Sequence, residues 1–295
     1  MSKMKLSTFL TKKEPILLDG SMGTQLEHLG SEMGGQSNLS HPEHVLKIHQ
    51  HYAECGCDML ITNTLTMNRI FIEIHKMDID VREVNLIGVQ LAKQAANPDQ
   101  YILGNISSTG VMLEPYGDLP ESKARQAFAE QAALLQEGGV DGFIIETMMD
   151  LKEALSALRA CKEVSSLPVM VSMAFSTPEK GGRTIMGNSA RECATALTES
   201  GAQAIGANCG DIDPFQMAKI VSIMHIETRQ PIIAQPNAGR PKWFNSRTTF
   251  DMDPARFSEG IAACIQNGAK LIGGCCGTSP DHISAVVQMF KKHQT

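Results

Sequence analysis

The sequence predicts an α/β protein, a single closed (β/α)8 barrel, and two observations support this fold class. Eight short runs rich in Ile, Val and Leu recur along the chain, and each ends in Gly, Asn, Thr or another polar residue. Amphipathic stretches separate these runs, and such strict alternation favours right-handed crossovers and a parallel sheet. A doubly wound open sheet is the alternative, but residues 19–30 lack the Gly-rich phosphate turn that usually follows its first strand.

The expected strands are short and apolar on both faces, which is typical of parallel strands buried on both sides of a sheet. Each ends at a turn or polar residue, which limits its length. The expected strands cover residues 16–20, 59–64, 101–107, 142–147, 168–175, 204–210, 231–239 and 271–277.

The expected helices carry recognisable start signals. Three of them open with Asp-Pro or Ser-Pro, a capping side chain followed by proline at the first helical position. The nine histidines fall mostly on helices or loops, where we expect them to face solvent. The expected helices cover residues 41–56, 81–97, 120–139, 150–164, 189–201, 213–228, 253–268 and 279–290.

Three longer irregular stretches follow predicted strands, at residues 29–41, 176–188 and 240–253. In a barrel, loops on that side surround the active site. No linker or low-complexity tract interrupts the pattern, so we treat residues 1–295 as one barrel domain.

Composition and charge argue against several classes of partner. The net charge is −6, the pI is about 5.9 and no basic run exceeds two residues, so nothing favours nucleic acid or an anionic membrane. The sequence shows neither a transmembrane-length apolar stretch nor a signal-peptide core. We therefore expect a cytoplasmic protein whose eight cysteines are thiols, metal ligands or core residues. The oligomeric state is left open.

Three cysteines lie at the ends of predicted strands. Cys209 closes the sixth run, and the adjacent Cys275 and Cys276 close the eighth, between paired glycines. Alternate strands of a barrel feed one layer of side chains, so we expect the three sulfurs to converge. Adjacent cysteines form a disulfide poorly, whereas three thiolates with one open position make a good zinc site. The alternative is that they are buried thiols, like the other five cysteines.

Carboxylate and amide side chains gather at the same predicted mouth. Asp19 with Gly20, Asn63, Glu146 and Asn237 lie at the ends of four other runs. Buried acids are unusual unless they are paired or face a ligand, so Asp19 and Glu146 could hold a cationic ammonium group beside the metal. The alternative is that these acids cap a neighbouring loop or helix.

Several segments together resemble the homocysteine S-methyltransferase family, most closely the homocysteine-binding barrel of cobalamin-dependent methionine synthase. The segments are LLDGSMGTQL, TNT, LEPYGDL, IIETMMDLKEA, GANCG, QPNAG and GGCCGTSPDHI. They occur in the order that the family has, and the resemblance runs from about residue 10 to residue 292.

The resemblance implies an enzyme that moves a methyl group to the thiol of homocysteine and yields methionine. It implies one Zn²⁺ per chain on Cys209, Cys275 and Cys276, with Asn237 able to fill the fourth position when the thiol is absent. It places Asp19, Gly20 and Glu146 around the amino acid end of homocysteine, and we expect Asn63 in the same pocket.

The methyl donor is the open question. The full cobalamin-dependent enzymes carry folate, corrinoid and activation modules, for which 295 residues leave no room. We expect the methyl group to come from a separate methyl-corrinoid protein carrying methylcobalamin. The alternatives are free methylcobalamin or S-methylmethionine as donor, a different thiol or methylated substrate, and a thiol- or zinc-binding module without activity. Residues 240–253, which include Trp243 and Phe244, form either a docking site for a partner or a packed surface loop.

Overall fold

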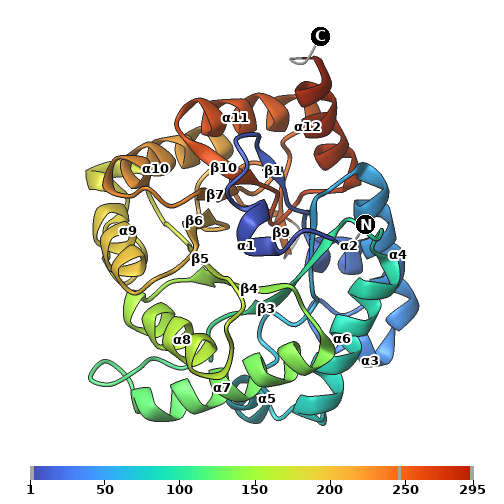
Figure 1. Ribbon diagram of the computed structural model, residues 1–295, viewed down its shortest axis with the longest axis vertical. Helices are drawn as coiled ribbons and strands as arrows, with labels where there is room; N and C mark the ends of the chain where they lie inside the picture. The colour runs from blue at the N-terminus through green and yellow to red at the C-terminus, as the bar shows by residue number, and fades with distance from the viewer. Residues whose placement is uncertain (1–2, 245–246, 293–295) are drawn as a thin grey trace.

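The structure closes eight parallel strands into a barrel. This computed structural model describes residues 3–244 and 247–292. Hydrogen bonds join the strands in the order β1-β10-β7-β6-β5-β4-β3-β2, and a parallel bridge from Leu18 to Met59 joins the two outer strands. The predicted (β/α)8 barrel is therefore confirmed, and Figure 1 looks down it. The strands are β1 (Ile16–Leu17), β2 (Met59–Ile61), β3 (Tyr101–Ile106), β4 (Gly142–Met148), β5 (Val169–Met173), β6 (Ala204–Asn208), β7 (Ile232–Gln235) and β10 (Ala269–Ile272).

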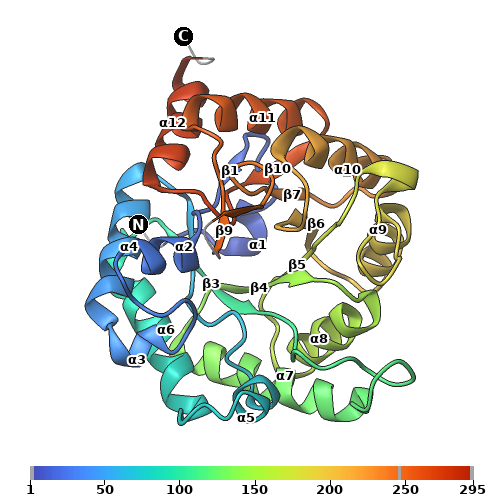
Figure 2. The same cartoon turned by 180° about the vertical axis from the view of Figure 1, so that it is seen from behind.

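The long helices form a ring around the strands (Figures 1 and 2). The predicted caps are present where α10 and α11 begin: the Asp213 and Asp253 side chains each accept a backbone N–H at 2.9 Å. None of the helices in the described part of the chain has the length and apolarity needed to cross a membrane. These helices are α4 (Pro42–Cys55), α6 (Val81–Ala95), α7 (Glu121–Gly138), α8 (Leu151–Val164), α9 (Ala190–Glu199), α10 (Pro214–Glu227), α11 (Pro254–Gln266) and α12 (Pro280–Lys292).

Short elements lie in the connections between the barrel strands and the long helices. The sequence pattern did not predict them. Two of the stretches expected to be irregular each contain one, because α3 lies within residues 29–41 and η1 within residues 176–188. These elements are too short for the periodicity of a sequence to reveal them. They are α1 (Leu6–Phe9), α2 (Met22–His28), α3 (Ser37–Ser40), α5 (Arg69–Ile74) and the 3₁₀ turn η1 (Glu179–Gly181).

The stretch 240–253, which was expected to be irregular, contains two short strands. Strands β8 (Lys242–Phe244) and β9 (Arg247–Thr249) pair antiparallel, with Trp243 opposite Thr248. Aromatic and β-branched residues favour such pairing. Residues 245–246 lie outside the described part of the chain. Trp243 and Phe244 are 76% and 62% exposed.

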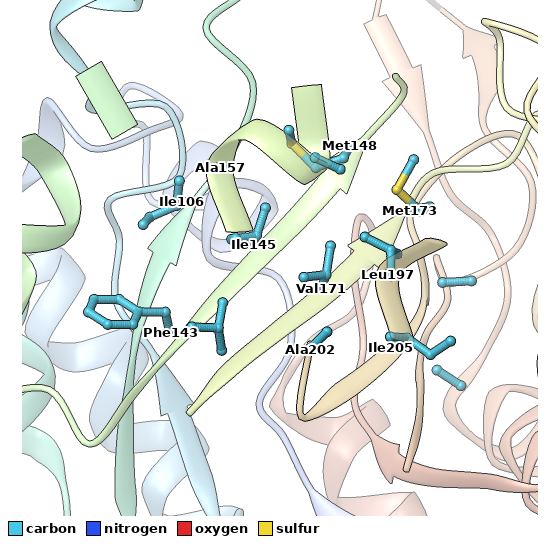
Figure 3. Close-up of a cluster of buried hydrophobic side chains, with 14 of the residues drawn as sticks. Ile106, Phe143, Ile145, Met148, Ala157, Val171, Met173, Leu197, Ala202 and Ile205 are labelled. Atoms are coloured by element: carbon cyan, nitrogen blue, oxygen red, sulfur yellow. The ribbon is translucent and has the colours of Figure 1, made fainter. Parts of the chain in front are cut away.

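Side chains along each strand alternate between two apolar layers. On β4, Phe143 and Ile145 belong to the cluster between strands and helices, whereas Ile144 belongs to the cluster inside the barrel. Figure 3 shows the outer layer, in which side chains from β3, β4, β5 and β6 lie beside Ala157 of α8 and Leu197 of α9. This two-residue period decides which positions at the strand ends can face the interior.

Helix α1 closes the amino-terminal end of the barrel. Leu6, Phe9 and Leu10 are buried in the same cluster as the inward-facing strand residues. Figure 1 shows α1 lying across that end of the barrel. The opposite end, where the carboxyl ends of the strands meet, therefore remains as the mouth.

The expectation that the histidines face solvent is wrong for two of them. His282 of α12 is buried and hydrogen-bonds the Met252 carbonyl at 2.8 Å. His49 is the other. This residue of α4 is fully buried, and neither ring nitrogen has a partner among the described residues. Burial lowers the pKa of His49 to about 4. The spacing correctly predicts a helix here, but His49 lies on the side of α4 that faces the core, beside Val45, Ile48 and Tyr52.

His49→Leu is expected to stabilise the protein by about 1–3 kcal/mol at pH 7, because it removes buried polar atoms that have no partners. In the wild type the unfolded state binds the proton first, with a pKa near 6.5 against about 4 in the folded state. Stability is therefore lost as pH falls between these values, by on the order of 3 kcal/mol.

Urea unfolding at several pH values measures both effects. His51→Leu, an exposed position on the same helix, serves as the control and should retain the pH dependence of the wild type. An equal loss of stability in His49→Leu and the wild type between pH 6.5 and 4 would contradict the assignment of this loss to His49.

Candidate metal centre and substrate pocket

A layer of polar side chains lies directly above the apolar interior of the barrel. On each of five strands the polar residue sits two or four positions beyond an inward-facing apolar residue, so it also faces inward. For example, Glu146 follows Ile144 on β4, and Gln235 follows Ile233 on β7. The members of this polar layer are all buried: Asn105, Glu146, Ser172, Asn208 and Gln235.

Three cysteines converge beside the polar layer. Cys209 follows β6, and Cys275 and Cys276 follow β10; their sulfurs all lie within 4.8 Å of one another. The Sγ atoms of Cys209 and Cys276 are 3.8 Å apart. Strand β7 lies between β6 and β10 in the sheet, so the convergence comes from alternate strands, as the barrel geometry predicts.

Backbone hydrogen bonds with residues at the end of β7 fix the two segments that carry these cysteines. The Cys209 N–H donates to the Gln235 carbonyl at 3.1 Å, and the Cys275 N–H donates to the Pro236 carbonyl at 2.8 Å. The Ala238 N–H donates to the Cys276 carbonyl at 2.9 Å. The positions of the sulfurs are thus set by the barrel itself and not by a flexible loop.

Glycines allow the segment that carries Cys275 and Cys276 to turn within this crowded space. A Cβ at Gly274 would lie 2.6 Å from the Thr278 hydroxyl, which leaves no room for a side chain. Gly277 has φ +79°, a left-handed conformation that glycine adopts without strain. The paired glycines around the cysteines therefore serve close approach and turning.

The cluster has the spacing and chemistry of a zinc site. Thiolates bound tetrahedrally to one zinc ion at about 2.3 Å would lie about 3.8 Å apart, which matches the separation of Cys209 and Cys276. Hydrogen bonds from Cys209 and Cys275 lower the pKa of Cys276, whereas the same contacts raise the pKa of Cys275. Thiolate sulfur is a soft ligand, so a cluster of three cysteines favours a soft cation such as Zn²⁺ over Mg²⁺ or Ca²⁺.

Asn237 supplies a possible oxygen ligand next to the cluster. Its side-chain N–H donates to the Gly210 carbonyl at 2.8 Å, and its Oδ1 is buried without a partner among the described residues. An unpaired buried oxygen is costly unless a ligand completes it. The residues present therefore fit a zinc ion with three sulfur ligands and one exchangeable position.

A cavity of about 300 Å³ opens beside the cysteines. Of the residues predicted to bind substrate, Asp19, Gly20, Asn63 and Glu146 line it, together with Cys275 and Cys276. Asn237 does not line this cavity. The structure thus places two carboxylates and two thiols around one space large enough for a small amino acid.

The two carboxylates differ in their partners. The Asp19 carboxylate accepts the Ile61 backbone N–H at 2.9 Å, so it partly has the structural capping role that we considered as the alternative. Glu146 accepts the Asn105 side-chain N–H at 2.8 Å. Burial raises the pKa of Asp19 above its usual range and raises the pKa of Glu146 to about 7. A cation in the cavity would favour the charged form of both groups.

The side chain of Asn63 is engaged elsewhere. Its amide donates to the Gly34 carbonyl at 2.9 Å and to the Asn38 side chain at 3.1 Å. Asn63 therefore lines the cavity while it holds the loop before α3 in place.

Two further residues face the cavity that were not expected to bind substrate, although Asn105 lies near the end of the expected strand 101–107 and so at the predicted mouth. Asn105 and Gln235 line it, and the side-chain oxygens of both are buried without a partner among the described residues. The Asn105 amide also donates a hydrogen bond to Glu146 at 2.8 Å, and both amides act to lower the pKa of Glu146 against the effect of burial. The signal for them is present in the sequence as a polar residue two positions beyond an inward-facing apolar residue, at Leu103 and Ile233.

A second cavity, of about 370 Å³, lies on the other side of the cysteines. Cys209, Cys276 and Asn237 line it, and its other walls are mainly apolar, with Phe175 and Phe250. Among the described lining residues Asp211 is the one charged side chain. The thiol cluster therefore forms part of the wall between two cavities, one acidic and one mainly apolar.

Comparisons with known proteins point to one family. A sequence model of the family described as homocysteine S-methyltransferase matches residues 16–290. The chain is similar to methionine synthases of Mycobacterium leprae and Mycobacterium tuberculosis, at 29% and 28% identity over 289 residues. Each alignment covers 91% of this chain and 24% of the relative, so the chain spans about a quarter of their length.

Solved structures of low identity show the same fold. The metallated form of the homocysteine methyltransferase MmuM from Escherichia coli matches with a TM-score of 0.78 at 20% identity, covering 97% of this chain and 100% of that one. A carboxyl transferase domain of Rhizobium etli pyruvate carboxylase matches with a TM-score of 0.60 at 15% identity, covering 97% and 44%. The barrel alone therefore does not decide the chemistry.

Cys276→Ala is expected to abolish stoichiometric zinc binding and to leave the barrel folded, because the cysteine lines a cavity at the mouth. Zinc content by atomic absorption and far-ultraviolet circular dichroism measure the two properties. Cys161→Ala, which removes a fully buried thiol from α8, is the matched control and should keep the metal. Full zinc occupancy in Cys276→Ala would exclude this cluster as the metal site.

Proposed function

The chain belongs to the homocysteine S-methyltransferase family, and we propose that it transfers a methyl group to the thiol of homocysteine in a zinc-dependent reaction that forms methionine. The observation that carries this proposal is the placement of three cysteine sulfurs between an acidic cavity and a mainly apolar one. An acceptor in the first cavity and a donor in the second would meet at the cluster. We take residues 1–295 as a single domain that contains both sites.

The first cavity suits the amino acid end of homocysteine. Asp19 and Glu146 offer carboxylates, and Asn105 and Gln235 offer amide oxygens without other partners. An ammonium group has three N–H donors and no acceptor, so it can satisfy several of these oxygens at once. A different thiol that lacks the ammonium group would leave them unpaired, which favours homocysteine over simple thiols.

The protein residues position the acceptor sulfur for transfer. A zinc ion held by Cys209, Cys275 and Cys276 would keep an added thiol in its thiolate form at neutral pH. The ammonium-binding groups direct the substrate chain so that its sulfur lies at the cysteine wall. Asn237 would hold the fourth position on the zinc ion as a neutral group in the absence of this sulfur. The sulfur then forms a bond to the methyl carbon while the donor leaves with the electron pair of its own bond.

We propose a methyl-corrinoid protein as the donor, on the basis of the resemblance to cobalamin-dependent methionine synthase. Four exposed apolar side chains lie on segments that follow barrel strands, where a large donor would approach: Met149 and Ile185 in connections, and Trp243 and Phe244 on β8. With the donor on a separate protein, this mouth is also the partner surface. All eight cysteines are free thiols, consistent with action in the reducing cytoplasm.

A small sulfonium donor such as S-methylmethionine is the second candidate. The second cavity, at about 370 Å³, is large enough to enclose such a molecule but not a corrin ring system. Phe175, Phe250 and Asp211 offer two aromatic rings and one carboxylate, which are groups that bind cations. The two donors therefore predict different sensitivity to the charge of Asp211.

Glu146→Gln is expected to weaken homocysteine binding by about 10–100-fold at pH 8, because a charged hydrogen bond to the ammonium group is lost. The pKa of Glu146 is raised to about 7, so the wild type loses the anion as pH falls below that value. The affinity ratio of wild type to variant should therefore shrink toward pH 6.

Isothermal titration calorimetry of the zinc-loaded protein with homocysteine measures this ratio. Protonation of homocysteine affects the wild type and the variant equally, so it does not change the ratio. Glu153→Gln is the matched control, since Glu153 is buried on α8 and lines neither cavity. Unchanged affinity in Glu146→Gln would show that the amino acid end binds elsewhere.

Methionine formation by zinc-loaded protein, with methylcobalamin and S-methylmethionine compared side by side, tests the proposed function and its donor. We expect turnover with methylcobalamin and little effect of Asp211→Asn, because that donor carries no cation into the second cavity. Turnover with S-methylmethionine, weakened several-fold in KM by Asp211→Asn, would favour the second candidate. Bound zinc without turnover from either donor would contradict methyl transfer to homocysteine.

A further inference from the structure

We infer that Asn208 is a positioning residue that holds the thiol cluster in its metal-binding geometry and donates a hydrogen bond to the sulfur of Cys275. Asn208 is fully buried at the end of β6, in the polar layer, and lines neither cavity. This inference rests on the proposed function in one respect, that the cluster binds a metal.

The amide of Asn208 uses all of its hydrogen-bonding capacity. Its Oδ1 accepts the Thr147 backbone N–H and the Ser172 hydroxyl, each at 2.8 Å. Its Nδ2 donates to the Thr147 Oγ1 at 2.8 Å and to the Cys275 Sγ at 3.8 Å. One side chain therefore joins β4, β5, β6 and the segment after β10.

The orientation of this amide follows from its neighbours. A backbone N–H can only donate, so the atom of Asn208 that faces the Thr147 N–H must be the oxygen. The NH₂ group is then directed at the sulfur of Cys275, and no rotation of the amide can exchange the two roles without losing the Thr147 contact.

The backbone on both sides of this contact is in an unfavourable conformation. Thr147 has φ 58° and Cys209 has φ 55°, in the left-handed region that β-branched and other non-glycine residues rarely adopt. Such conformations persist where surrounding contacts determine them, and they cluster at functional sites. Asn208 bonds directly to Thr147 and directly precedes Cys209, so it is placed to stabilise both.

The contact with sulfur has an electronic consequence. Three thiolates around one divalent metal carry a net negative charge, and an N–H directed at one sulfur stabilises that charge. Groups that orient and polarise metal ligands in this way typically change metal affinity by about 10–100-fold when they are removed. Without the amide, the sulfur lone pairs of Cys275 rise in energy.

Asn208→Ala is therefore expected to weaken zinc binding by about 10–100-fold in competition with a chelator. It should also shift the sulfur-to-metal charge-transfer absorption of the Co²⁺-loaded protein to longer wavelength. Ser172→Ala removes a hydroxyl that contacts the same amide but not the sulfur, so it serves as the matched control. We expect its affinity to stay within a few-fold of the wild type and its absorption band to stay unshifted.

A double variant separates the sulfur contact from backbone support. Thr147→Gly relieves the left-handed strain at residue 147, so a role of Asn208 confined to supporting the backbone there predicts that Asn208→Ala with Thr147→Gly recovers wild-type metal affinity and absorption. Our inference predicts that the double variant stays weak and shifted. Recovery in the double variant, or equal zinc affinity and spectra in Asn208→Ala and the wild type, would overturn it.

Neither measurement needs homocysteine or a methyl donor. Failure of the wild type to bind zinc or Co²⁺ at the cluster would contradict the proposed function itself. Metal binding that is strong in the wild type and equally strong in Asn208→Ala would contradict only the role of Asn208.

Discussion

Closure of the barrel is the constraint on which the rest of this structure depends. The bridge between Leu18 and Met59 joins the two outer strands, so the carboxyl ends of all eight strands surround one small space. Helix α1 fills the opposite end with Leu6 and Phe9. Polar side chains at the strand ends must therefore satisfy one another or a ligand, because they are buried and the closed barrel leaves no sheet edge to bond.

Most of these polar side chains do satisfy one another. Asn208 bonds to Thr147 and Ser172, and Asn105 bonds to Glu146. The exceptions face the two cavities beside the cysteines, and the unpaired oxygen of Asn237 is one of them. A buried acceptor without a partner costs about 1–3 kcal/mol, so these atoms mark where a ligand completes the structure.

Backbone strain is present at the strand ends beside the same cluster of cysteines. Left-handed backbone at Thr147 and Cys209 costs on the order of 1–3 kcal/mol at each residue. The turn at Cys209 accompanies the approach of its sulfur to within 3.8 Å of Cys276. Stability given up at these positions is offset by the apolar layers on both faces of the strands, which are packed and closed to solvent.

The sequence by itself determined the barrel, since strand and helix periods are local properties that alternate along the chain. It also determined which cysteines follow the sixth and eighth barrel strands, β6 and β10, and barrel geometry was enough to bring them together. Tertiary structure alone decided the burial of His49 and the pairing of 242–249 into a hairpin. It alone decided that the Asn63 side chain binds a loop, because the direction of a side chain depends on neighbours distant in sequence.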